Sequence, residues 1–148
     1  MKEHLNVNPF QSLRDYEDYI YTLKHRFAVI QSSTLVIYPR GPRTAMLQGE
    51  IVFTHGYRIT VRERLSFDAG SVQIEFYGYE LWRDMEKIAW YDAQPHPEDV
   101  TLSSTFPHHK HLPPDIRYHR IPASNMSFSQ PNISALIQEI ERCIASAA

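Results

Sequence analysis

The spacing of apolar residues predicts a helix at each end of the chain. Apolar side chains in 13–27 recur at alternating intervals of three and four, and Ser12 with Asp15 suits a helix start. Residues 133–144 follow the same period. Cys143 belongs to that second apolar stripe, so we interpret it as a core-facing structural thiol rather than a nucleophile.

Between these helices the apolar period falls to two, which predicts β-strands. Short turns separate most of them, and short loops join antiparallel neighbours. We therefore predict an α+β fold: an antiparallel β-meander of about five strands with an N-terminal and a C-terminal helix. The helices should cover one face of the sheet and leave the other free. The expected strands are 27–38, 44–53, 57–67, 71–83 and 87–92.

Residues 93–132 interrupt this pattern because they hold most of the prolines and histidines of the chain. Proline lacks a backbone donor and fixes φ, so we predict a long Pro/His-rich loop with one short strand at 115–121. Long loops inside a compact domain are often functional.

The composition is that of an ordinary globular domain, and we expect residues 1–148 to form a single one. The chain is 43% hydrophobic and 22% charged, with a net charge of −2. Nucleic-acid binding would therefore depend on a local basic patch. No signal peptide or membrane span is apparent, and the one cysteine is compatible with a reducing compartment, so we expect a cytoplasmic protein without a membrane partner.

Glu63 is the first candidate for chemistry. Strand alternation places it on the apolar face of 57–67. A buried carboxylate must be neutral, paired or at a cleft. It could be a general acid or base or a metal ligand with a perturbed pKa; equally, it could form a structural ion pair, or a bulge could turn it to the other face.

Candidates for substrate binding lie on two adjacent strands. Arg62 belongs to a row of three arginines that could bind phosphates or form only a solvated surface. Tyr77, Tyr79 and Arg83 share one parity on the next strand and could stack bases, although packing or a protein interface is the alternative. Gly78 between the tyrosines indicates a bulge or a close approach of another group.

The run "TFPHHKHLPPD" (105–115) is the densest cluster of chemical groups. In an extended segment His109 and His111 point the same way, and His108 and Lys110 complete the run. Neutral imidazoles could transfer protons or bind a metal, and we favour acid/base or phosphate contacts over a metal at His108, His109 and His111. A solvated histidine-rich loop is the alternative.

Two further residues accompany this run. Asp92 comes directly before the Pro-rich segment and could anchor it or orient a histidine. His96, between two prolines, is a candidate second member of the site.

The segments "YGYELW", "WYDAQPHP" and "FPHHKH" resemble the TumE-like toxin family of bacterial type II toxin–antitoxin systems. The likeness extends from about residue 16 to the final helix, and "FPHHKH" is its specific part. The sequence departs from the family pattern at Trp90, Ala93 and Pro97, where arginine, asparagine and histidine are common. The resemblance implies a small bacterial toxin paired with a DNA-binding antitoxin, for which a ribonuclease-like action is a reasonable expectation.

Three hypotheses follow. The first is a metal-independent RNA-cleaving toxin in which His109 or His111 moves protons, Lys110 and Arg83 stabilise charge, and Glu63 assists; it requires 105–111 to lie against the sheet near Glu63. The second is a metal-dependent nuclease or hydrolase with Glu63 or Asp92 as further ligands. The third is a binding module without catalysis, docking an antitoxin or a second copy as a homodimer.

Overall fold

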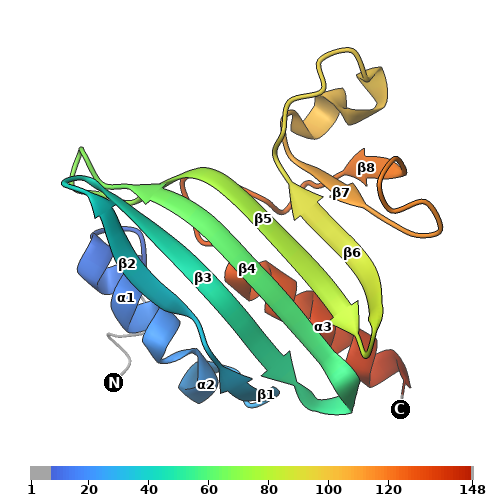
Figure 1. Cartoon of the computed structure of the whole chain (residues 1–148), viewed down its shortest axis with the longest axis horizontal. Coiled ribbons are helices and arrows are strands. Elements are labelled where there is room, and N and C mark those ends of the chain that lie inside the picture. Colours follow the sequence, from blue (N-terminus) through green and yellow to red (C-terminus); the bar gives the residue numbers. More distant parts are fainter. Residues whose placement is uncertain (1–7, 148) are drawn as a thin grey trace.

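The structure, a computed structural model, describes residues 8–147 as one antiparallel sheet with helices at both ends of the chain (Figure 1). The helices are α1 (Leu13–Tyr21), α2 (Leu23–Arg26) and α3 (Ile133–Ala147), with 3-10 turns η2 (Thr54–Gly56) and η3 (Val100–Thr105). The strands are β1 (Ile30–Ser33), β2 (Val36–Gly41), β3 (Thr44–Phe53), β4 (Tyr57–Ser66), β5 (Gln73–Arg83), β6 (Glu86–Asp92), β7 (His109–His111) and β8 (Arg120–Pro122). None of the helices in this part of the chain is long and apolar enough to cross a membrane.

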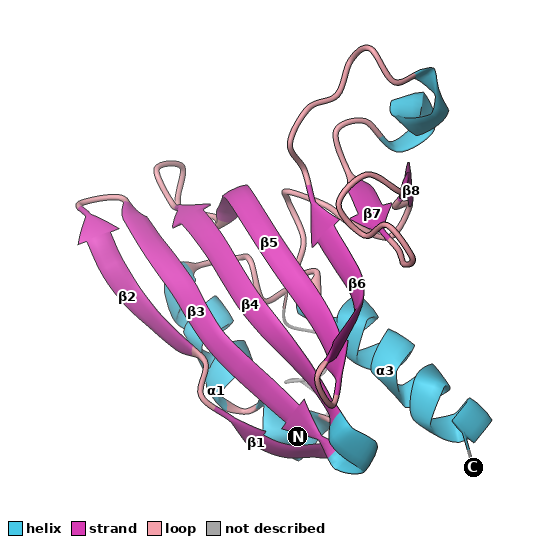
Figure 2. Ribbon diagram, turned by 45° about the vertical axis from the view of Figure 1, so that its right-hand side comes forward, coloured by secondary structure: helices cyan, strands magenta, loops and turns pink. Residues whose placement is uncertain are grey.

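The sheet has the strand order β1-β3-β4-β5-β6-β7-β8, and β2 also pairs with β3. Strands β3 to β6 form the predicted meander. The helices lie against one face and leave the opposite face without a helix (Figure 2). We call the first the covered face, which carries Glu63 and Tyr91, because Glu63 contacts α1 and Tyr91 contacts α3. The open face carries Arg62, Gly78 and Asp92, which are in register across β4, β5 and β6.

The first helix begins as predicted but is interrupted. Ser12 Oγ accepts a hydrogen bond from the backbone N–H of Asp15 at 3.1 Å and caps α1. The continuous helix predicted over 13–27 is wrong because Thr22 leaves helical geometry, with φ −115° and ψ 13°. Its hydroxyl donates to the carbonyl of Asp18 at 2.6 Å, and such a bond competes with the helical backbone.

The strand predicted over 27–38 is also two strands. The chain crosses between β1 and β2 at Thr34 and Leu35, directly beside Gly49 of β3. A side chain at Gly49 would lie 2.6 Å from the carbonyl oxygen of Thr34, and the φ of Gly49 is +144°, so glycine alone suits this crossing. Leu35 is turned into the core there.

The sheet has eight strands rather than about five, because the strand predicted over 27–38 is split in two and because 93–132 is not all loop. Strand β7 pairs with β6 and β8 pairs with β7, which extends the sheet by two strands. The prediction of a loop depended on the prolines of this segment, but β7 contains no proline. Pro122 lies at the end of an edge strand, where the missing backbone donor costs little. The strand predicted over 115–121 is confirmed only at its end, since β8 begins at Arg120.

The core lies between the covered face and the helices. Residues on β4 alternate as predicted, with odd positions buried and even positions facing outward. Cys143 is partly buried and packs against this core. The largest fully buried side chains are Tyr16, Tyr77, Tyr79, Phe10, Phe53, Ile20, Leu23, Leu47, Ile51, Ile59, Leu65 and Leu81.

Candidate functional site

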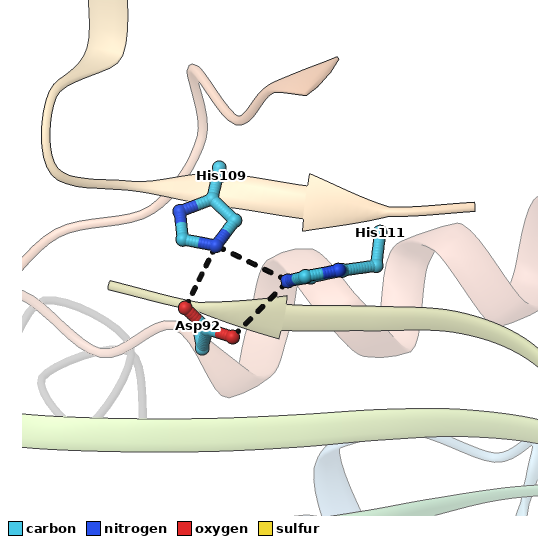
Figure 3. Close-up of side chains that lie close together, drawn as sticks. All are labelled: Asp92, His109 and His111. Atoms are coloured by element: carbon cyan, nitrogen blue, oxygen red, sulfur yellow. Dashed lines mark hydrogen bonds and ion pairs between the residues drawn. The ribbon is translucent and has the colours of Figure 1, made fainter. Parts of the chain in front are cut away.

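Asp92, His109 and His111 converge on the open face, where β6 and β7 pair (Figure 3). His109 Nε2 lies 2.8 Å from Asp92 Oδ1, and His111 Nε2 lies 3.2 Å from Asp92 Oδ2. The two Nε2 atoms are 3.1 Å apart. All three residues are buried, with exposed fractions of 8%, 1% and 4% in that order. We call these three residues the Asp–His cluster. Such an arrangement can hold a proton or a metal ion between its members.

The backbone holds both imidazoles from behind. His109 Nδ1 lies 3.1 Å from the carbonyl oxygen of Pro107, and His111 Nδ1 lies 2.8 Å from that of Ile116. The ring of Trp90 stacks on His111 with centroids 4.2 Å apart. Both rings are therefore fixed with Nε2 directed at Asp92.

Asp92 also ties down the chain that follows it. Its Oδ1 accepts a hydrogen bond from the backbone N–H of Gln94 at 3.0 Å. Burial raises the pKa of the Asp92 carboxyl, but its contacts with His109, His111 and Gln94 lower the pKa by more than burial raises it. The pKa therefore lies well below the usual range. The group is thus a carboxylate that both anchors the segment and orients two histidines.

A groove of about 300 Å³ on the open face is lined by Trp90, which stacks on His111, and by Gly78, which is in register with Asp92. Gly78 forms part of its lining and leaves open space where a side chain would stand, next to Asp92 in the register. Arg62, Phe76 and Trp90 line it as well, and Phe76 is about half exposed at 47%. A cation and two aromatic rings beside a glycine suit a phosphate and a base.

The arginines of β4 differ in their partners. Arg58 pairs with Glu50 at 3.5 Å and lies over the ring of Trp82. Arg62 and Arg64 are exposed and pair with no carboxylate among residues 8–147. The open face therefore has a local positive patch although the chain is slightly acidic.

Glu63 lies on the covered face, away from the Asp–His cluster. Its Oε1 accepts a hydrogen bond from Tyr16 at 2.6 Å, and its Oε2 accepts one from Tyr79, whose oxygen also accepts from Asn132 at 3.1 Å. Burial raises the pKa of Glu63 to about 7, and the two tyrosine hydrogen bonds offset part of the rise. Glu63 is fully buried and contacts neither imidazole of the cluster. Glu63 therefore does not meet His109 or His111, as the first hypothesis required; His108 reaches only Tyr77, the register partner of Glu63.

Other predicted residues also lie on the covered side. Tyr77 and Tyr79 are fully buried and stack on each other, so they offer no surface for bases. Lys110 points to α3 and pairs with Glu139 at 2.8 Å. His108 turns away from its neighbours: its Nδ1 lies 2.6 Å from the hydroxyl oxygen of Tyr77, and burial, followed by the charge of His109, lowers its pKa.

His96 and Arg83 complete the predicted set. The ring of His96 meets His109 edge-on at 5.1 Å, but His96 Nε2 accepts a hydrogen bond from Arg120 at 2.7 Å and does not enter the cluster. Arg83 is exposed, ends β5 and lies over the ring of Tyr57. Its register partner is Glu86, the first residue of β6, whereas Asp92 is the last residue of that strand. Arg83 therefore lies at the opposite end of β6 from the Asp–His cluster.

Sequence reasoning missed two residues near the cluster. Trp90 appeared only as a departure from the family pattern, and Arg120 was only part of a short strand. In the register both lie opposite His111, one on each side of it. The parity of Trp90 with Asp92 was a usable signal, whereas nothing local marks Arg120.

Comparison with known proteins gives one match. A family model described as Toxin TumE matches residues 17–144, most of the chain. No curated protein and no solved structure matches it.

Proposed function

Since the chain belongs to the TumE toxin family, we propose that it is the toxin of a toxin–antitoxin pair and that it cleaves RNA at the Asp–His cluster. The observation that carries this proposal is the convergence of Asp92, His109 and His111 on the open face, which also carries a groove lined by Arg62. A family of toxins also implies a cognate antitoxin that masks the activity.

The chemistry of RNA cleavage fits such a centre. The 2′-hydroxyl attacks the adjacent phosphate as its proton is removed, and the 5′-oxygen leaves as it gains a proton. An imidazole can transfer these protons, or a bound cation can activate the attacking oxygen. In either route the carboxylate of Asp92 can hold the two imidazoles in place or bind the cation.

The groove suggests how RNA is positioned. Arg62 can contact a phosphate, and the half-exposed ring of Phe76 can stack on a base. Arg120 brings a further guanidinium to the strand beside His111. It can take the role of stabilising phosphate charge that the sequence assigned to Lys110, which the ion pair with Glu139 occupies.

Asp92→Asn tests the proposal. The asparagine keeps an oxygen for the N–H of Gln94 and can donate to His111 Nε2, so the fold should survive while the charge is lost. We expect RNA cleavage by the purified protein to fall by about 100-fold or more, and growth inhibition on expression to disappear.

His25→Ala is the matched control, because His25 is exposed on α2. It should leave both readouts unchanged. The proposal is wrong if the wild-type protein leaves RNA intact, or if Asp92→Asn cleaves at the wild-type rate. A stable antitoxin complex without cleavage would favour a binding module instead.

A further inference from the structure

The Asp–His cluster holds more acceptor atoms than hydrogens to satisfy them. Carbonyl oxygens cannot donate, so the contacts of Nδ1 with Pro107 and Ile116 require a hydrogen on Nδ1 of each imidazole. In a neutral ring Nε2 then carries a lone pair. Both lone pairs point at the carboxylate of Asp92 and at each other.

Protonation of the Nε2 atoms does not make all three close contacts favourable. One proton on either Nε2 leaves at least one close contact between two acceptors, because the cluster has three such contacts. A proton on both lets each N–H donate to one oxygen of Asp92, but it sets two imidazolium cations with their Nε2 atoms 3.1 Å apart against a single carboxylate. The first solution leaves two acceptors in contact and the second adds an uncompensated positive charge, and both are costly for residues with exposed fractions of only 8%, 1% and 4%.

A cation satisfies all three contacts at once. Ligand atoms at about 2.0–2.1 Å from a zinc ion stand roughly 3.3 Å apart in a tetrahedron, and about 3 Å apart when they lie at right angles. The separations in the cluster are 2.8, 3.1 and 3.2 Å. The first and last of these separations involve different oxygens of Asp92, and all three are close to the edge of such a ligand shell; one ligand atom from each residue lies within 4.8 Å of the others.

We propose that Asp92 Oδ, His109 Nε2 and His111 Nε2 bind one divalent transition-metal ion, such as Zn²⁺. Imidazole favours this class over Mg²⁺ and Ca²⁺, which prefer oxygen ligands. Three protein ligands leave a position for water or substrate, as in catalytic zinc sites. The carbonyls of Pro107 and Ile116 act as the outer partners that metal-bound histidines use.

The accessible side of the site is at Asp92, whose register neighbour Gly78 lines the groove. The side chain of Asp92 is 12% exposed, whereas those of His109 and His111 are 1% and 5% exposed. Asp92 neighbours Gly78, where no side chain blocks the approach. A substrate phosphate in the groove could thus reach the free position of the metal. The metal site follows from the cluster alone and holds whether or not RNA is the substrate.

The ligand set differs from the one the sequence suggested. His108 belongs to the same histidine run, but its Nδ1 contacts Tyr77 on the covered side. His108→Gln should therefore leave the metal site intact, while Asp92→Asn and His111→Gln remove one ligand each. The comparison separates a built site from a histidine-rich segment that binds metal loosely.

The experiment uses the full chain without a histidine tag, stripped with a chelator and titrated with Zn²⁺ by calorimetry. We expect one ion per chain, and affinity lower by about 100-fold or more in Asp92→Asn and His111→Gln but unchanged in His108→Gln. Circular dichroism checks that each variant folds. Sub-stoichiometric binding by the wild type, or equal binding by all variants, overturns the proposal.

The wild-type protein gives a second readout that needs no variant. Co²⁺ bound by two imidazoles and a carboxylate gives visible absorption bands that differ from those of the aqueous ion. Spectra identical to aqueous Co²⁺ at one equivalent overturn the proposal. Neither measurement involves RNA, so a metal-binding protein that cleaves no RNA would refute the proposed function and leave the metal site standing.

Discussion

The sheet carries a buried polar cluster on each face, and the carboxylates of the two clusters differ in their hydrogen-bond donors. On the covered face, Glu63 accepts one hydrogen bond from each of two tyrosines, so each oxygen has a donor. On the open face, Asp92 meets two imidazoles whose hydrogens are already used by backbone carbonyls. Two tyrosine hydroxyls supply the hydrogens that the first cluster needs, whereas the second lacks hydrogens for its three contacts. Burial of a charge is therefore a weaker indicator of a site than the count of donors around it.

Glu63→Gln should give the largest change in stability among the variants that test this comparison. The folded pKa of Glu63 is about 7, above its ordinary value of 4.5. A raised carboxyl pKa gives stability that is fully present below pH 4.5 and is lost as the pH rises through 7. The wild type should thus lose about 3 kcal/mol of unfolding free energy between pH 5 and pH 9, and the variant should lack this loss. Chemical denaturation at several pH values measures it.

The exposed carboxyl of Glu50 on the open face provides the control. Glu50→Gln should keep the wild-type pH profile. If Glu63→Gln shows the same pH-dependent loss as the wild type, Glu63 is not the titrating group. The glutamine amide can donate to Tyr16, whose hydroxyl is free to turn, so the variant should fold.

A smaller effect is expected from Tyr79→Phe. The change removes a donor from Glu63 and an acceptor from Asn132, which should cost about 1–2 kcal/mol of unfolding free energy. It should also raise the folded pKa of Glu63 further, because this hydrogen bond lowers it, so the loss of stability with rising pH should continue to higher pH and be larger than in the wild type.

Tyr77→Phe is the matched change, since the hydroxyl of Tyr77 contacts His108 and not Glu63. It should leave the pH profile of stability where it is in the wild type. Equal shifts in both variants would show that the effect is general to the tyrosine stack rather than specific to the carboxyl.

The smallest effect concerns the open face. Arg62→Gln should weaken RNA binding several-fold and reduce the slope of log affinity against log salt by about one, as the loss of one phosphate contact does. Arg58→Gln should change the slope less, because Arg58 already pairs with Glu50. Fluorescence anisotropy of a labelled RNA at several salt concentrations provides the test. Equal slopes in the two variants would remove Arg62 from the binding surface.

The sequence by itself determined the local features of this protein. Period two in 57–67 put Glu63 on the buried face, and the structure confirms that placement with an exposed fraction of 0%. The H-x-H spacing aligned His109 with His111, and both do point at Asp92. These features depend on residues a few positions apart, which is the range over which helix and strand periodicity act.

Tertiary structure alone decided which groups meet. The register of β6 with β7 brings Asp92 to His109 across sixteen intervening residues, and no local pattern sets that register. It also puts Glu63 and the histidine pair on opposite faces of one sheet, although the sequence suggested them as partners. Strand pairing results from the packing of the whole sheet. Local sequence patterns can therefore identify the residues of a site but not which of them come together.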